Sequence, residues 1–116
     1  MFNGLICIFE EVSSLSIYKT IRQTVQDNLP NCRIVLFGSR ARGNDDRFSD
    51  YDLLIITPQT FTPKEKVLWS TRLDKAIIKA IQAPVDLVLS SEEEIRWQNE
   101  LPGHIVRTAM REGVAL

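Results

Sequence analysis

Apolar residues recur at helical spacing from about Ser14 to Leu29, which predicts an amphipathic helix that ends at Pro30-Asn31. Residues 1–12 before it are apolar but short. They fit an edge strand, a docked segment or a partner-binding arm, and the pattern does not choose among these. The apolar positions that define the helix are Ile17, Ile21, Val25 and Leu29.

Three runs of β-branched and apolar residues predict strands at 33–37, 51–57 and 85–89. The first run ends at Gly38, and a polar loop rich in turn-forming residues (43–49) precedes the second. The first strand is expected to be central.

Two capping boxes mark helix starts. Thr62 and Glu65 flank Pro63, which suits the first helical position, and this helix should end before Pro84. Ser91 and Glu94 form the second box, which opens a short helix to about Asn99. A last helix is expected from Ile105, Val106, Ala109 and Met110. The sequence therefore predicts a small mixed β-sheet with helices packed against it, an α/β (α+β) fold, in a single domain over 1–116 with a segment of uncertain role at 1–12.

The composition is that of an ordinary globular domain, with 44% hydrophobic and 25% charged residues. A formal net charge of −1 provides no general attraction for nucleic acid or for an anionic membrane, so neither is expected as a partner. Cys7 and Cys32 are expected to be free, buried thiols in a reducing cytosol. We therefore expect a soluble cytoplasmic protein, as a homodimer or a hetero-oligomer.

The turn after the first strand could bind an anion. Gly38 allows the backbone to approach a ligand closely because it has no Cβ. Backbone amides after Ser39 would lie at a helix N-terminus, which favours negative charge, and the Ser39 hydroxyl, Arg40 or Arg42 could add contacts to a phosphate. An ordinary helix start with surface arginines is the alternative.

Two carboxylates follow this turn at a sequence spacing that allows a loop to bring them close to it. Ten residues separate Ser39 from Asp50, and Asp50 and Asp52 point to the same face if they continue a strand. Asp86 interrupts the third apolar run, where burial would be costly without compensation. If the strands are neighbours, the three carboxylates converge and suit Mg²⁺ or Mn²⁺. Alternatively, Asp50 caps a strand or a turn and Asp86 lies at an exposed strand end.

The combination of Gly38-Ser39, ten residues and Asp50-Tyr51-Asp52 resembles the signature of the minimal nucleotidyltransferases of the DNA polymerase β superfamily. The flanking Ala41-Arg42-Gly43 is also similar to that family. The resemblance extends from about Ser14 to the end of the chain and implies a polymerase β-like nucleotidyltransferase fold.

This resemblance implies roles for the site residues. Asp50 and Asp52 would be the metal-binding pair, Asp86 the third carboxylate, and Gly38 and Ser39 the triphosphate-binding turn. Two ions are implied: one held by all three aspartates at the acceptor hydroxyl, the other held by the pair at the leaving phosphates. Asp86 is also a candidate general base.

The same resemblance implies transfer of AMP from ATP to an acceptor hydroxyl. Similar small proteins are antitoxins that modify a tyrosine of a helical HEPN toxin, and this is the function we expect. The alternatives are a catalytically silent module that masks its partner, and a transferase for an antibiotic-type small molecule. Single residues outside the motif suggest less: His104 fits a surface or helix-start role, and Arg47 fits either a phosphate contact or a solvated loop.

Overall fold

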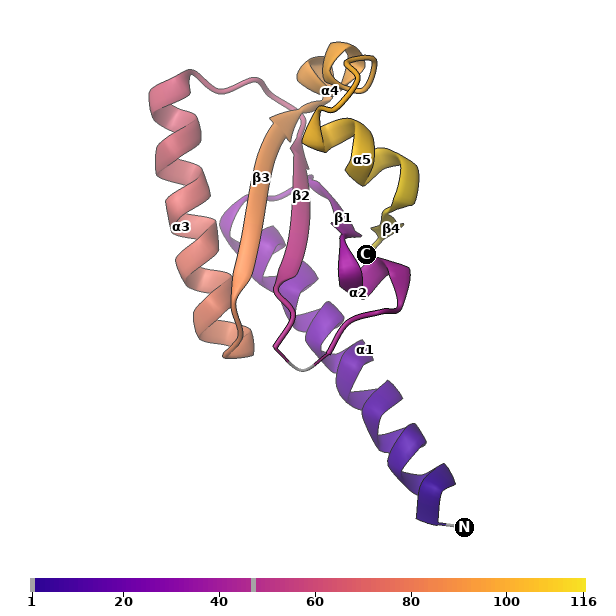
Figure 1. The fold of residues 1–116 in the computed structure, drawn as a ribbon. Helices are drawn as coiled ribbons and strands as arrows, with labels where there is room; N and C mark the ends of the chain where they lie inside the picture. The colour runs from indigo at the N-terminus through magenta and orange to yellow at the C-terminus, as the bar shows by residue number, and fades with distance from the viewer. Residues whose placement is uncertain (1, 47) are drawn as a thin grey trace.

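The computed structural model describes residues 2–46 and 48–116, with only the backbone described for 2–14. This part of the chain forms five helices and four strands (Figure 1). The helices are α1 (Phe2–Asn28), α2 (Ser39–Arg42), α3 (Pro63–Ile81), α4 (Glu92–Gln98) and α5 (Ile105–Glu112). The strands are β1 (Arg33–Phe37), β2 (Tyr51–Thr57), β3 (Val85–Ser91) and β4 (Val114–Ala115).

The four strands form one mixed sheet in the order β3-β2-β1-β4. β1 runs antiparallel to both β2 and β4, whereas β2 and β3 are parallel. The three predicted strands are therefore neighbours, and β1 is an interior strand as expected. The mixed α/β prediction is confirmed.

Helices cover both faces of the sheet (Figure 1). Alternate strand residues, such as Leu53 and Ile55, pack with α1 and α3. The intervening residues, such as Leu54 and Ile56, pack with α4 and α5. The first core includes Ile21, Val25, Leu36, Leu73 and Ile77; the second includes Val35, Phe37, Ile95, Val106 and Ala109.

Both predicted capping boxes form. The Thr62 hydroxyl accepts from the Glu65 amide at 3.2 Å, and the Glu65 carboxylate accepts from the Thr62 amide at 3.1 Å. Ser91 and Glu94 make the same exchange, with both bonds at 3.0 Å. His104 begins α5 through its Nδ1, which accepts from the Val106 amide, so its predicted helix-start role is confirmed.

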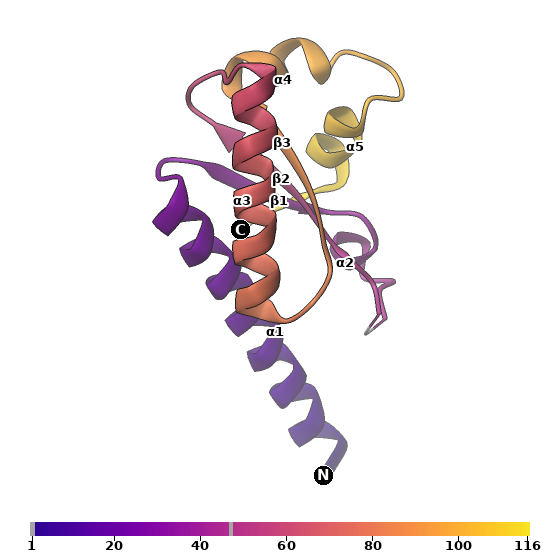
Figure 2. The ribbon, with the colours of Figure 1, turned by 90° about the vertical axis from the view of Figure 1, so that its left-hand side faces the viewer.

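The predicted start of the first helix is wrong. α1 begins at Phe2 rather than near Ser14, so 2–12 is not an edge strand. No proline interrupts 2–28, and serine can lie inside a helix as well as cap one. The N-terminal half of α1 extends beyond the sheet (Figure 2). Of the two cysteines, Cys32 is free and buried, while the side chain of Cys7 lies outside the described residues.

β4 was not predicted. It has two residues, and it exists because Ala115 pairs with Val35 and Val114 with Leu36 of β1. Gly113 makes this pairing possible, since a Cβ there would overlap Val35 and the Ala109 carbonyl oxygen. No helix in the described part of the chain is long and apolar enough to cross a membrane.

Candidate active site

One end of the sheet brings the predicted aspartates together. Asp52 lies between Phe37 of β1 and Asp86 of β3 in the strand register. By strand alternation its side chain lies on the α4/α5 face, the face of Leu54 and Ile56. Asp50 precedes Asp52 by two residues, at the end of the loop. Of the three carboxylates predicted to converge, the register thus places Asp52 and Asp86 side by side.

Asp86 is exposed at the start of β3. The argument that burial makes this carboxylate costly is thus wrong, because water reaches it. Asp86 is both exposed at a strand end and adjacent to Asp52 in the register. The interpretation as an exposed strand end and the interpretation as a third carboxylate of the site are therefore compatible.

The carboxylates act on one another. Burial raises the pKa of Asp52, and the negative charges of Asp86 and Asp50 raise it further, while Arg42 opposes them. Like charges therefore gather around a partly buried carboxylate. A cation between them would relieve this repulsion.

The donor chemistry fits Mg²⁺ or Mn²⁺, which prefer carboxylate oxygens and retain positions for water and phosphate. Among the described residues, no three His, Cys, Asp or Glu side chains are grouped closely enough to form a complete ligand set as they stand. Asp52 and Asp86 are adjacent in register, and Asp50 lies two residues before Asp52, so these three carboxylates would supply the oxygen donors to a bound ion.

Gly38 joins the turn to this carboxylate. It has a φ of 75° and ψ of −155°, in the region that favours glycine. A Cβ at Gly38 would also overlap Oδ2 of Asp52. The turn after β1 and the acidic end of β2 are therefore in direct proximity, with Ser39 following as the first residue of α2.

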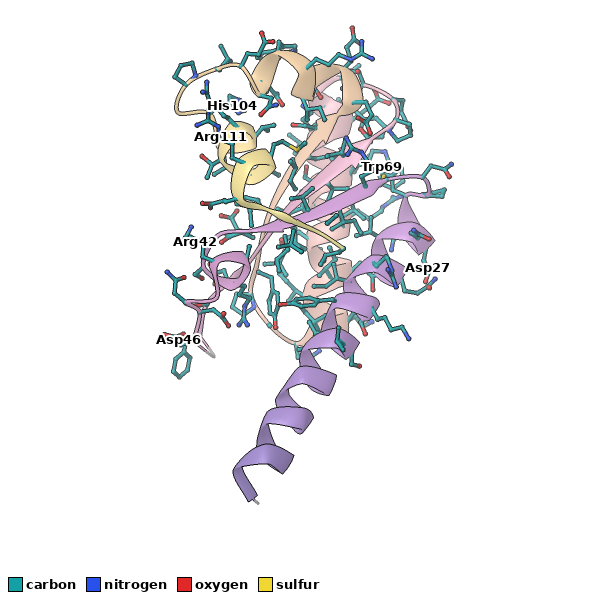
Figure 3. The ribbon with its side chains drawn as sticks, turned by 90° about the vertical axis from the view of Figure 1, so that its right-hand side faces the viewer. Asp27, Arg42, Asp46, Trp69, His104 and Arg111 are labelled. Carbon is teal, nitrogen blue, oxygen red and sulfur yellow. The ribbon has the colours of Figure 1, made fainter. Side chains whose placement is uncertain are left out.

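Arg42 lies on the carboxylate side of α2. Its guanidinium donates to Glu112 of α5 at 3.0 Å, and its side chain is 47% exposed. Figure 3 shows Arg42 on the side of the sheet where Arg111 lies, away from Asp27 of α1. The positive charge of Arg42 lowers the pKa of Asp52, against the larger effects of burial and of the neighbouring aspartates.

Arg40 has different surroundings. Its guanidinium donates to the Ser49 carbonyl oxygen from Nε and Nη2, at 3.1 and 2.8 Å. It lies 3.9 Å from the centre of the Tyr51 ring and pairs with Asp45 at 3.2 Å. Tyr51 itself was missed as a site residue. The available signal was its position between two aspartates, which turns its ring to the opposite face. Arg47 lies outside the described residues.

A cavity of about 830 Å³ lies elsewhere, between α1, α2 and β4. Its lining includes Leu15, Tyr18, Leu36, Arg40 and Leu116, and none of the three aspartates. The cavity and the predicted carboxylates therefore lie in different places. We take the aspartates as the candidate active site because their carboxylates can bind a cation, whereas this cavity is mainly apolar.

Sequence comparison decides the family. The profile of the nucleotidyltransferase domain matches residues 18–116. The chain belongs to the nucleotidyltransferase domain family. Among curated proteins, none matches this nucleotidyltransferase chain.

Solved structures share the fold. A toxin–antitoxin crystal structure with AMP-PNP superposes with a TM-score of 0.63 at 23% identity, covering 84% of this chain and 69% of the other. A mutant of the MntA-HpeT toxin–antitoxin gives 0.59 at 20% identity, over 84% and 69%. A structure described as a minimal nucleotidyltransferase gives 0.58 at 23% identity, over 84% and 87%. At these identities the likeness establishes the nucleotidyltransferase fold.

Proposed function

We propose that this nucleotidyltransferase transfers AMP from ATP to a hydroxyl of a partner protein, a tyrosine of a HEPN-type toxin, and so acts as an antitoxin. The observation that carries the chemistry is the contact between the Gly38 turn and Asp52, which lies beside Asp86 in the strand register. The fold shared with toxin–antitoxin structures supports the choice of partner.

Each site residue has a part in this proposal. Asp50, Asp52 and Asp86 would hold Mg²⁺ or Mn²⁺, as two ions. Bound ions would neutralise phosphate charge and lower the pKa of the acceptor hydroxyl. Gly38 and Ser39 would hold the triphosphate, and Arg42 would add a positive charge on the same side.

The reaction forms one bond and breaks another. The acceptor oxygen bonds to the α-phosphorus, and the bond from that phosphorus to the α,β-bridging oxygen breaks, which releases pyrophosphate. The hydroxyl proton must leave as this happens. Asp86 is the candidate base, because its exposed carboxylate can be reached from the solvent side of the site.

The test uses labelled ATP and a helical HEPN-type protein co-purified with this chain. With Mg²⁺, α-labelled ATP should place label on the partner, whereas γ-labelled ATP should leave none. Asp50→Asn should reduce labelling by about 1000-fold or more, since it removes an anionic ligand from the site. Quantified gel autoradiography measures both.

Two results would contradict the proposal. Label from the γ position would indicate a kinase. If Asp50→Asn silences the partner as completely as the wild type at equal stoichiometry, the chain neutralises its partner by binding alone. The same assay with an aminoglycoside in place of the protein tests a small-molecule acceptor.

A further inference from the structure

We infer that Arg40 is a positioning residue that holds Asp50 beside Asp52, and that it does not bind phosphate. This inference rests on the proposed function, because it assigns a task to Arg40 within the same metal-binding site. It differs from the sequence prediction, which grouped Arg40 with Arg42 as nucleotide-binding residues.

Arg40 forms hydrogen bonds with Ser49, the residue before Asp50. Two of its nitrogens donate to the Ser49 carbonyl oxygen, and Nη2 also reaches the Asp46 carbonyl oxygen at 3.4 Å. These bonds are directed at backbone atoms of the loop. They fix the path by which the chain enters Asp50, at a point where Asp50 itself is exposed.

Arg40 also grips the residue after Asp50. Its guanidinium lies over the Tyr51 ring, which is buried and meets Tyr18 of α1 edge-on at 6.5 Å between centroids. The Tyr51 amide donates to the Pro84 carbonyl oxygen at 3.1 Å. Since Pro84 lies two residues before Asp86, this bond joins the Asp50–Asp52 segment to the start of β3.

The two arginines of α2 point to opposite sides. They are two residues apart, which is about 200° around a helix. Tyr51 packs on the α1/α3 face, and the Arg40 guanidinium lies against the Tyr51 ring. Asp52 lies on the other face with Arg42 and Glu112. The Arg40 guanidinium, whose side chain is 12% exposed, is thus separated by Tyr51 from the face that carries the aspartates.

Only a guanidinium suits this position. Its planar fork donates two bonds, from Nε and Nη2, to the one carbonyl oxygen of Ser49 while it lies over a ring, whereas a lysine ammonium is a single compact point charge. Arg40→Lys should therefore retain the positive charge and lose most of the grip on Ser49. Arg40→Gln should lose both.

The experiment measures Mn²⁺ affinity of the purified full chain by electron paramagnetic resonance, together with the KM for ATP at saturating Mg²⁺. Arg40→Gln is the main variant. Arg33→Gln is the matched control, because Arg33 also donates two bonds, to Glu92 at 2.7 and 2.9 Å, at the opposite end of β1. Melting temperatures verify folding, and Arg40→Lys serves if Arg40→Gln does not fold.

We expect the Mn²⁺ affinity of Arg40→Gln to be at least about tenfold lower than that of the wild type, since loss of a group that orients metal ligands has effects of this order. The Mn²⁺ affinity of Arg40→Lys should fall by a smaller factor. The KM for ATP should stay within about twofold, because uniform substrate binding is untouched. Arg33→Gln should match the wild type in both measurements.

A raised KM for ATP at saturating Mg²⁺, with unchanged Mn²⁺ affinity, would overturn the inference and assign Arg40 to phosphate binding. Unchanged values for both would also overturn it, even if the melting temperature falls. If the wild type and Asp52→Asn bind Mn²⁺ equally poorly, the metal site of the proposed function fails as well.

Discussion

The two ends of the sheet differ in whether their polar and charged side chains are paired. At the end where β2 and β3 finish, beside α4, polar groups are paired: Lys66 donates to Glu94 at 2.6 Å, and the buried Ser90 hydroxyl donates to Gln98 at 2.9 Å. At the end where these strands begin, Asp50, Asp52 and Asp86 bring like charges together.

The pKa values follow this difference. Burial would raise the pKa of Glu94, but hydrogen bonds from Lys66 and the Ser91 amide outweigh it and leave that pKa lowered. The pKa of Glu92 is lowered by its hydrogen bond from Arg33. The pKa of Asp52 is raised by burial and by its acidic neighbours. The end of the sheet beside α4 is therefore stabilised by paired polar groups. The end with the aspartates retains repulsion between negative charges, which a bound cation would relieve.

Outside the three aspartates, the largest effect on transfer is expected at the turn after β1. In Gly38→Ala, the new methyl group would overlap Asp52, and we expect transfer to fall by about 100-fold because the site is displaced. Gly103→Ala is the matched control: Gly103 has a similar φ of 79°, and nothing lies within 4 Å of the added Cβ. Gly103→Ala should lose about 1–2 kcal/mol of unfolding free energy from backbone strain, and Gly38→Ala should lose more, because its φ and ψ are nearly restricted to glycine and its Cβ would overlap Asp52.

Transfer assays and thermal melts on the two glycine variants separate strain from displacement of the site. Equal loss of transfer in both would show that backbone strain alone explains the effect. In that case the proximity of Gly38 to Asp52 has no functional role.

A smaller effect, on stability alone, is expected at the paired end. Ser91→Ala removes the cap of α4 and the partner of the Thr60 hydroxyl, which donates to it at 2.8 Å. We expect a loss of about 1–2 kcal/mol and a melting temperature lower by about 4–10 °C, with transfer unchanged below the transition. Thr71→Ala, at an exposed position of α3, should change neither. A tenfold loss of transfer in folded Ser91→Ala would break the division between the two ends.

The features that local chemistry determines could be predicted from the sequence. Thr62-Pro63 and Ser91 with Glu94 mark helix starts because each cap is made within four residues. The strands at 33–37 and 51–57 were predicted at their observed bounds because their apolar runs end at turn residues. The third strand runs two residues further than predicted, to Ser91, since Ser90 and Ser91 pair with β2.

Features that depend on distant contacts could not be predicted. Val114 and Ala115 form a strand only through β1. The orientations of Arg40 and Arg42 depend on Tyr51 and Glu112, which local sequence does not place. For the site, the spacing of Ser39 and Asp50 suggested proximity, but the register between Asp52 and Asp86 required the sheet.

Under the proposed function, Asp52 binds metal at a cost to the stability of the fold. Since its pKa is raised, the folded state holds this proton more tightly than the unfolded state. The carboxyl group therefore favours folding below its ordinary pKa of 3.8, and that advantage is lost as the pH rises through the raised pKa. Glu94 has the opposite sign: its contribution is present above its ordinary pKa of 4.5 and is lost as the pH falls.

The most direct measurement is the unfolding free energy of Asp52→Asn and Glu94→Gln between pH 3 and 7 without divalent ions, with transfer assayed on the same preparations with Mg²⁺. At pH 7 we predict that Asp52→Asn is more stable than the wild type by about 0.2–1 kcal/mol, the scale of a like-charge cross-strand pair, and inactive in transfer. Glu94→Gln should be less stable and active, and both differences should shrink toward pH 3. If Asp52→Asn is instead less stable at pH 7 and still transfers AMP, Asp52 neither binds the metal nor destabilises the fold.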